Sequence, residues 1–86
     1  MATKNYTEET KRNADEAERN AEYAAQANTA VKARHHARRA KRAADAAWWY
    51  ATQMGTPTCD KHARRARRAA SKAADSAINI DGADRR

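Results

Sequence analysis

Alanine recurs at alternating spacings of four and three residues through the second half of the chain. Because an α-helix turns about 100° per residue, this spacing places a stripe of small side chains along one side of each of two helices. The first stripe is Ala33, Ala37, Ala40, Ala44, Ala47, Ala51 and Met54, and the second is Cys59, Ala63, Ala66, Ala70, Ala73, Ala77 and Ile80. Residues 36–47 and 62–73 are identical at nine of twelve aligned positions, so the two helices repeat one design.

The residues between the two stripes are those that end one helix and begin another. Gly55 stands just past the first stripe, Thr56 is a capping residue, and Pro57 occupies the first helical position. The pattern therefore predicts an antiparallel helical hairpin, with helices over residues 29–54 and 57–80, whose seam consists of methyl groups. Gly82 is the predicted terminator, and residues 81–86 are predicted to form a charged tail.

The first part of the chain predicts a further, acidic helix over residues 7–27, preceded by a flexible tail at 1–6. Thr7 is its predicted cap, with acidic residues following at the positive end of the helix dipole. Nine residues separate Ala21 from Ala30, and nine residues make two and a half turns, so the stripe changes sides. Either the helix breaks at Asn28–Thr29 or it continues to residue 54 and needs a second chain.

We therefore predict an all-α fold: an alanine-rich antiparallel helical hairpin with an N-terminal helical arm. Three helical segments are favoured, although continuity of the first two agrees better with helix propensity, since neither glycine nor proline lies between them. The 86 residues form a single domain. Alanine makes up most of the hydrophobic residues and buries little surface, so the core is thin and a homo-oligomer is expected.

Several classes of protein are disfavoured by composition. The single Cys59 excludes an internal disulfide, and the longest apolar run, residues 46–51, has six residues where a membrane span needs about 20. Alanine also inserts poorly into a lipid surface. The sequence thus predicts a cytoplasmic protein without a membrane role.

Charge divides the chain into two unlike parts. Residues 1–31 carry four basic and six acidic side chains, whereas residues 32–72 carry twelve basic side chains against Asp45 and Asp60. The net charge of the whole chain is +7. The hairpin therefore suits a negatively charged partner, and the acidic part of the chain could shield it.

Arginine and lysine follow the predicted outer faces of the hairpin. The predicted binding residues are Arg38, Arg39 and Arg42 on the first helix and Lys61, Arg64, Arg65, Arg68 and Lys72 on the second. Three further cations, Arg34, Lys41 and Arg67, flank the seam. A charged face keeps an alanine-rich helix soluble, but the use of one sign and the preference for arginine favour phosphate contacts. Nucleic acid is the first hypothesis, and an acidic protein surface is the alternative partner.

Two tryptophans, Trp48 and Trp49, lie off the seam, as does Ile78. Either the acidic helix or a second chain covers the tryptophans, or they form an interaction site. In that case the alternative function is a protein-binding adaptor or inhibitor, of a phage or mobile-element type, that docks on a host protein complex. A stacking platform for bases is a further use of such side chains. A purely architectural, self-assembling module also remains open.

The side chains that could ligate a metal do not come together in this hairpin. Cys59 and His62 share a helical face, but His36 lies about 22 Å along the predicted hairpin from the level of His62. His35 is adjacent to His36 in the sequence and is therefore similarly distant. Cys59 is accordingly predicted to be a small buried thiol. Since no catalytic or cofactor motif stands out, we expect no enzyme activity, no cofactor, no metal and no small-molecule substrate.

Overall fold

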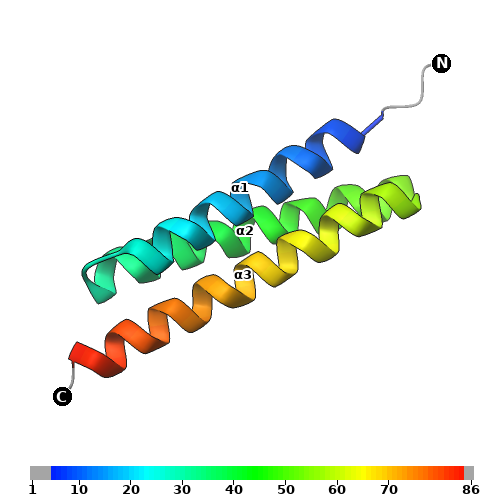
Figure 1. Cartoon of the computed structure of the whole chain (residues 1–86). Helices are drawn as coiled ribbons and strands as arrows, with labels where there is room; N and C mark the ends of the chain where they lie inside the picture. The colour runs from blue at the N-terminus through cyan, green and yellow to red at the C-terminus, as the bar shows by residue number, and fades with distance from the viewer. Residues whose placement is uncertain (1–4, 85–86) are drawn as a thin grey trace.

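The computed structural model describes residues 5–84, and over this range the chain forms three helices (Figure 1). These are α1 (Thr7–Gln26), α2 (Ala30–Met54) and α3 (Pro57–Asp84). Each helix packs against both of the others, in a rod whose backbone extends over 58 × 17 × 14 Å. The all-α fold with its hairpin is confirmed, and the continuous helix over residues 7–54 is wrong.

The chain turns back on itself between α1 and α2 through three non-helical residues. Ala27 has ψ 139°, and Thr29 is extended at φ −136° and ψ 152°. The Thr29 hydroxyl accepts a hydrogen bond from the Lys32 backbone N–H at 3.2 Å, which caps α2. This break lets α1 lay its methyl groups on the hairpin, and their burial outweighs the propensity for continuity. Covering α1 therefore requires no second chain.

The start of α1 differs from the predicted one. Tyr6 occupies the capping position without a side-chain hydrogen bond, and Thr7 already belongs to the helix. Instead, Asn5 Oδ1 accepts a hydrogen bond from the Thr7 backbone N–H at 2.9 Å. The Thr7 hydroxyl lies 3.7 Å from Cys59 Sγ on α3 and accepts from it. Thr7 thus links α1 to α3, and Asn5 satisfies the backbone N–H of Thr7.

The turn between α2 and α3 has the predicted chemistry. Gly55 is left-handed at φ 63°, and its N–H donates to the Ala51 carbonyl oxygen at 2.8 Å. The Thr56 hydroxyl accepts from the Cys59 N–H at 3.3 Å. Proline occupies the first position of α3, as predicted.

The predicted end of α3 at residue 80 is wrong, because the helix continues through Gly82 to Asp84. Gly82 keeps a helical backbone, and a single glycine costs about 1 kcal/mol in a helix without having to stop it. Helical structure thus replaces the first part of the tail predicted at 81–86, while residues 85 and 86 lie outside the described range. Residues 1–4 of the tail predicted at 1–6 also lie outside it.

Alanine methyl groups form almost the entire core. Buried alanines come from all three helices: Ala14, Ala17, Ala24, Ala30, Ala33, Ala40, Ala43, Ala44, Ala47, Ala51, Ala63, Ala66, Ala69, Ala73 and Ala77. The largest fully buried side chains are Thr10 and Cys59. Cys59 is a free thiol packed with Ala51 and Ala63 at the turn end of the rod. The predicted seam is therefore the real one, and α1 completes it.

One polar contact crosses the alanine core between α1 and α2. The side chain of Asn20 donates from Nδ2 to the Glu16 carbonyl oxygen at 3.0 Å. Its Oδ1 then faces His36 Nδ1 at 3.2 Å, so the imidazole N–H is the donor. Burial lowers the pKa of His36 below its ordinary 6.5, and His35 and Arg39 lower that pKa further. The folded protein thus favours the neutral imidazole.

Acidification is expected to destabilise the protein as the pH falls below 6.5. The unfolded chain then binds a proton at His36 that the folded chain resists, so the free energy of unfolding rises with pH across this interval. Urea unfolding at a series of pH values measures the slope. The variant His36→Gln keeps an N–H donor for Asn20 and should flatten the profile.

The neighbouring His35 supplies the matched control, because its side chain is exposed. The His35→Gln variant should retain most of the wild-type slope. An unchanged slope in His36→Gln would show that other groups, such as the α1 carboxylates, control the response to acid.

Candidate nucleic-acid interface

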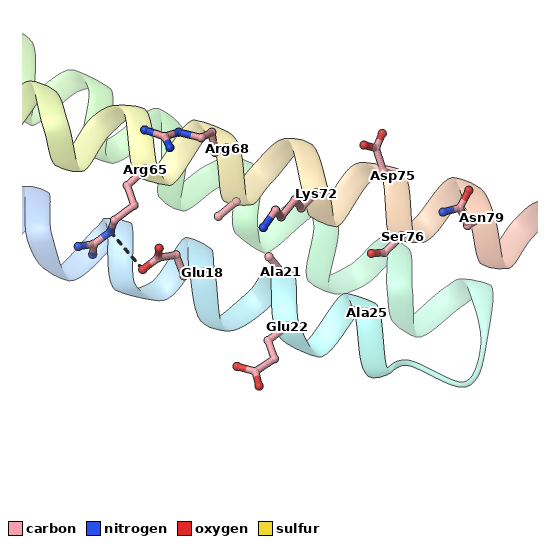
Figure 2. Close-up of a pocket in the computed structure, with 11 residues that line it drawn as sticks. Glu18, Ala21, Glu22, Ala25, Arg65, Arg68, Lys72, Asp75, Ser76 and Asn79 are labelled. Atoms are coloured by element: carbon pink, nitrogen blue, oxygen red, sulfur yellow. Dashed lines mark ion pairs between the residues drawn. The ribbon is translucent and has the colours of Figure 1, made fainter.

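The acidic helix α1 forms ion pairs with two of the arginines predicted to lie on the outer faces. Arg39 Nη2 on α2 lies 3.7 Å from Glu16 Oε1. Arg65 on α3 pairs through Nη2 with Asp15 and through Nε with Glu18 Oε1 at 3.1 Å, and Figure 2 shows this second pair. Arg39 remains exposed, whereas Arg65 is partly buried, because α1 occupies that side of the hairpin.

The six remaining predicted cations are exposed: Arg38, Arg42, Lys61, Arg64, Arg68 and Lys72. Arg68 and Lys72 line a groove of about 550 Å³ between α1 and α3, whose lining includes Glu18, Glu22 and Asp75 (Figure 2). A second hollow places Arg42 with Glu16. Arg42, Arg68 and Lys72 therefore lie near carboxylates, which reduce their attraction for an anion.

The face turned away from α1 has a different character. On α2, His36 and Arg39 contact α1, so the positions on the other side of the buried stripe point away from α1. The same holds on α3, where Arg65 contacts α1. We name this surface the distal face. It comprises Arg34, Arg38, Lys41, Asp45, Trp48 and Thr52 from α2 and Asp60, Arg64, Arg67, Ser71, Ala74 and Ile78 from α3, all exposed.

The distal face is basic and is remote from the carboxylates of α1. It bears five arginine or lysine side chains, and its acidic side chains, among those that the structure describes, are Asp45 and Asp60. Lys41 and Arg67, which lie at the edge of the predicted seam, belong to it. The sequence alone does not assign Lys41 and Arg67 to this face, because the assignment depends on which side of the hairpin α1 covers. Lys61 and Arg68 adjoin Arg64 around a further hollow at the start of α3.

The two tryptophans separate onto different surfaces, and α1 covers neither. Trp48 is 44 % exposed on the distal face, where the Arg67 guanidinium carbon lies 3.8 Å from its ring centroid. Trp49 is 53 % exposed and contacts the rings of Tyr6 and Tyr50, with centroids 5.9 and 5.1 Å away. Ile78 is 67 % exposed and lies about 20 Å along the rod from Trp48. The three do not form one patch.

The other candidate chemistry is not assembled in the described part of the chain. Among the side chains that the structure describes, no three of His, Cys, Asp or Glu are placed to hold a metal ion. No helix that the structure describes is long and apolar enough to span a membrane. Cys59, which the sequence predicts to be a small buried thiol, is fully buried.

The fold and these surfaces define a small all-α three-helix bundle that has a basic distal face and an acidic helix on the opposite side. Comparisons of this chain with protein-family models, curated proteins and solved structures give no match. The charges and aromatic side chains on its surface are therefore the basis for assigning a function.

Proposed function

We propose that this protein is a non-enzymatic nucleic-acid-binding protein that engages phosphates through its distal face. The observation that carries the proposal is the exposure of Arg38, Lys41, Arg64 and Arg67 on the side opposite α1. The paired carboxylates Asp15, Glu16 and Glu18 lie on the α1 side and are not available to neutralise them. Arginine suits this role, because its planar guanidinium can donate two hydrogen bonds to one phosphate.

The register of the hairpin arranges these cations as a diagonal row. Ala40 packs in one cluster with Ala73, and Ala47 packs in another with Ala66, which places Arg64 near the level of residue 49 on α2. The row from Arg38 to Arg64 is then about 17 Å long at 1.5 Å per residue. A duplex rises 3.4 Å along its axis for each nucleotide of one strand, so this length corresponds to about five nucleotides. The row can therefore follow a single nucleic-acid backbone.

The dependence of binding on salt tests this proposal. Anisotropy of a labelled oligonucleotide measures the affinity of the full-length protein from about 50 to 200 mM salt. Four phosphate contacts predict that log affinity falls with log salt at a slope of about −3. Polyglutamate of similar charge serves as the competitor, because an acidic protein surface presents carboxylates in place of phosphates. Absence of binding at the lowest salt, or preference for polyglutamate, would remove the proposal.

A second candidate function is docking on another protein, and exposure of Trp49 favours it. A tryptophan that is 53 % exposed beside Tyr6 and Tyr50 resembles the aromatic anchors of protein interfaces. Trp48 and the basic face could extend the contact. The Trp49→Ala variant should then lose a protein partner while its affinity for nucleic acid stays the same.

Self-association and a cytoplasmic location are parts of the same proposal. Because α1 is covered within one chain, a homo-oligomer would have to use exposed apolar residues such as Val31, Trp49 or Ile78. Light scattering on the purified protein gives the mass directly. A mass equal to that of one chain would refute the homo-oligomer without affecting the proposed phosphate contacts.

A further inference from the structure

We infer that Trp48 is a base-stacking site, and that the ligand of the distal face is single-stranded nucleic acid. This inference rests on the proposed function and adds the class of nucleic acid to it. The observation that leads to it is that the exposed indole of Trp48 stands within the basic distal face rather than apart from it.

The side chain of Trp48 is already part of a stack. The Arg67 guanidinium from α3 lies over its ring at 3.8 Å, and 44 % of the residue nevertheless remains exposed. Bases stack both on indole rings and on guanidinium planes, which gives a base two flat surfaces at one place. A base can extend the Trp48–Arg67 stack or replace the guanidinium, which is then released toward a phosphate.

One cation lies before Trp48 along the rod, and another lies beside it across the hairpin. Lys41 stands two helical turns before it on α2, about 10 Å away, and Arg64 lies across the hairpin near the level of residue 49. Asp45, one turn before Trp48, disfavours a phosphate directly beside the ring. A strand along this face thus meets Lys41 before the ring and Arg64 beside it on α3, and a base between phosphates held by these cations can reach the ring.

This arrangement selects a single strand, because the faces of paired bases are occupied by their neighbours in a duplex. Only an unpaired base can place its face against Trp48 without the cost of leaving a stack. Trp49 provides the internal comparison. It is more exposed than Trp48, but it contacts Tyr6 and Tyr50 instead of an arginine.

The test uses two oligonucleotides with the same number of phosphates. One is an oligothymidylate of about 12 nucleotides, and the other is an abasic strand of the same length. In the full-length Trp49→Phe variant, Trp48 is the only tryptophan that remains. Its fluorescence should be quenched by the oligothymidylate and should change little with the abasic strand. The abasic strand should also bind about 10-fold more weakly or worse.

Substitution at the two tryptophans separates stacking from phosphate contact. Trp48→Leu should weaken binding of the oligothymidylate about 10-fold and leave the abasic strand unaffected, whereas Trp49→Leu should change neither. Trp48→Tyr should restore most of the affinity, because it keeps an aromatic face. Circular dichroism and urea unfolding verify that each variant is folded, since the Arg67 contact also joins two helices.

The outcomes distinguish the two levels of the proposal. If both strands bind equally, with a strong salt dependence and no quenching, the phosphate-binding function stands and the stacking site is refuted. A duplex bound more tightly than oligothymidylate would refute the stacking site as well. If neither strand binds at low salt, the proposed function fails and this inference fails with it.

Discussion

Replacing Ala40 with leucine is expected to unfold most of the protein or to lower its melting temperature by roughly 12 to 24 °C. Ala40 is fully buried in one cluster with Ala24 of α1 and Ala73 of α3. A larger side chain can enter only if the helices move apart, and that movement weakens the contacts of neighbouring methyl groups along the rod. Overpacking of this kind costs about 3 kcal/mol, and each kcal/mol lowers the melting temperature of a small domain by about 4 to 8 °C.

Ala74→Leu is the matched control for this prediction, because Ala74 is exposed on the same rod. Leucine and alanine are both strong helix formers, so the control should melt within a few degrees of the wild type. Far-UV circular dichroism during heating measures both variants. Equal melting temperatures would mean that the seam tolerates leucine and that the helices are not held together by close methyl contacts.

The hairpin was predictable because its causes are local. The four-three alanine spacing determines which side of a helix is buried, and Gly55, Thr56 and Pro57 each act within a few residues of their own position. Neither signal depends on distant parts of the chain. The predicted seam agrees with the buried residues for that reason, except that Ala37, Met54, Ala70 and Ile80 are only partly buried.

The position of α1 was less predictable, because it depends on packing between helices. Asn28 and Thr29 permit a helix break without requiring one, and only the burial of Ala14, Ala17 and Ala24 against the hairpin decides it. The ion pairs that Arg39 and Arg65 form with α1 follow from this. A helical wheel of the hairpin alone leaves both side chains outside, whereas the third helix converts that side into an interface with Glu16 and Glu18.

The neighbours of the aromatic residues were also not predictable from the sequence. The spacing of the sequence places Trp48 and Trp49 off the seam, but it does not tell which neighbours they meet. Trp48 meets Arg67 only because α3 returns in the register that its alanines impose. A contact between residues on two helices is a property of that register, so it needed the structure.

Neutralising three cations of the distal face should weaken binding to single-stranded nucleic acid about 100-fold at 0.1 M salt. The variant Arg38→Gln, Lys41→Gln, Arg64→Gln leaves the Trp48–Arg67 stack in place and removes three of the proposed phosphate contacts. Each contact on a single strand contributes about 0.7 to the slope of log affinity against log salt, so the slope should fall by about 2. At 0.1 M salt that difference corresponds to two decades in affinity.

Three cations on the opposite side of the protein provide a control variant. This control distinguishes an effect of local phosphate contacts from an effect of total charge. Lys11, Arg12 and Arg19 on α1 are also two arginines and one lysine, and all three are exposed. Their triple glutamine variant carries the same net charge as the distal-face variant. If phosphates bind the distal face, this control should keep the wild-type slope and lose little affinity. Equal losses in the two variants would mean that only the overall charge attracts nucleic acid, because the two variants have the same net charge.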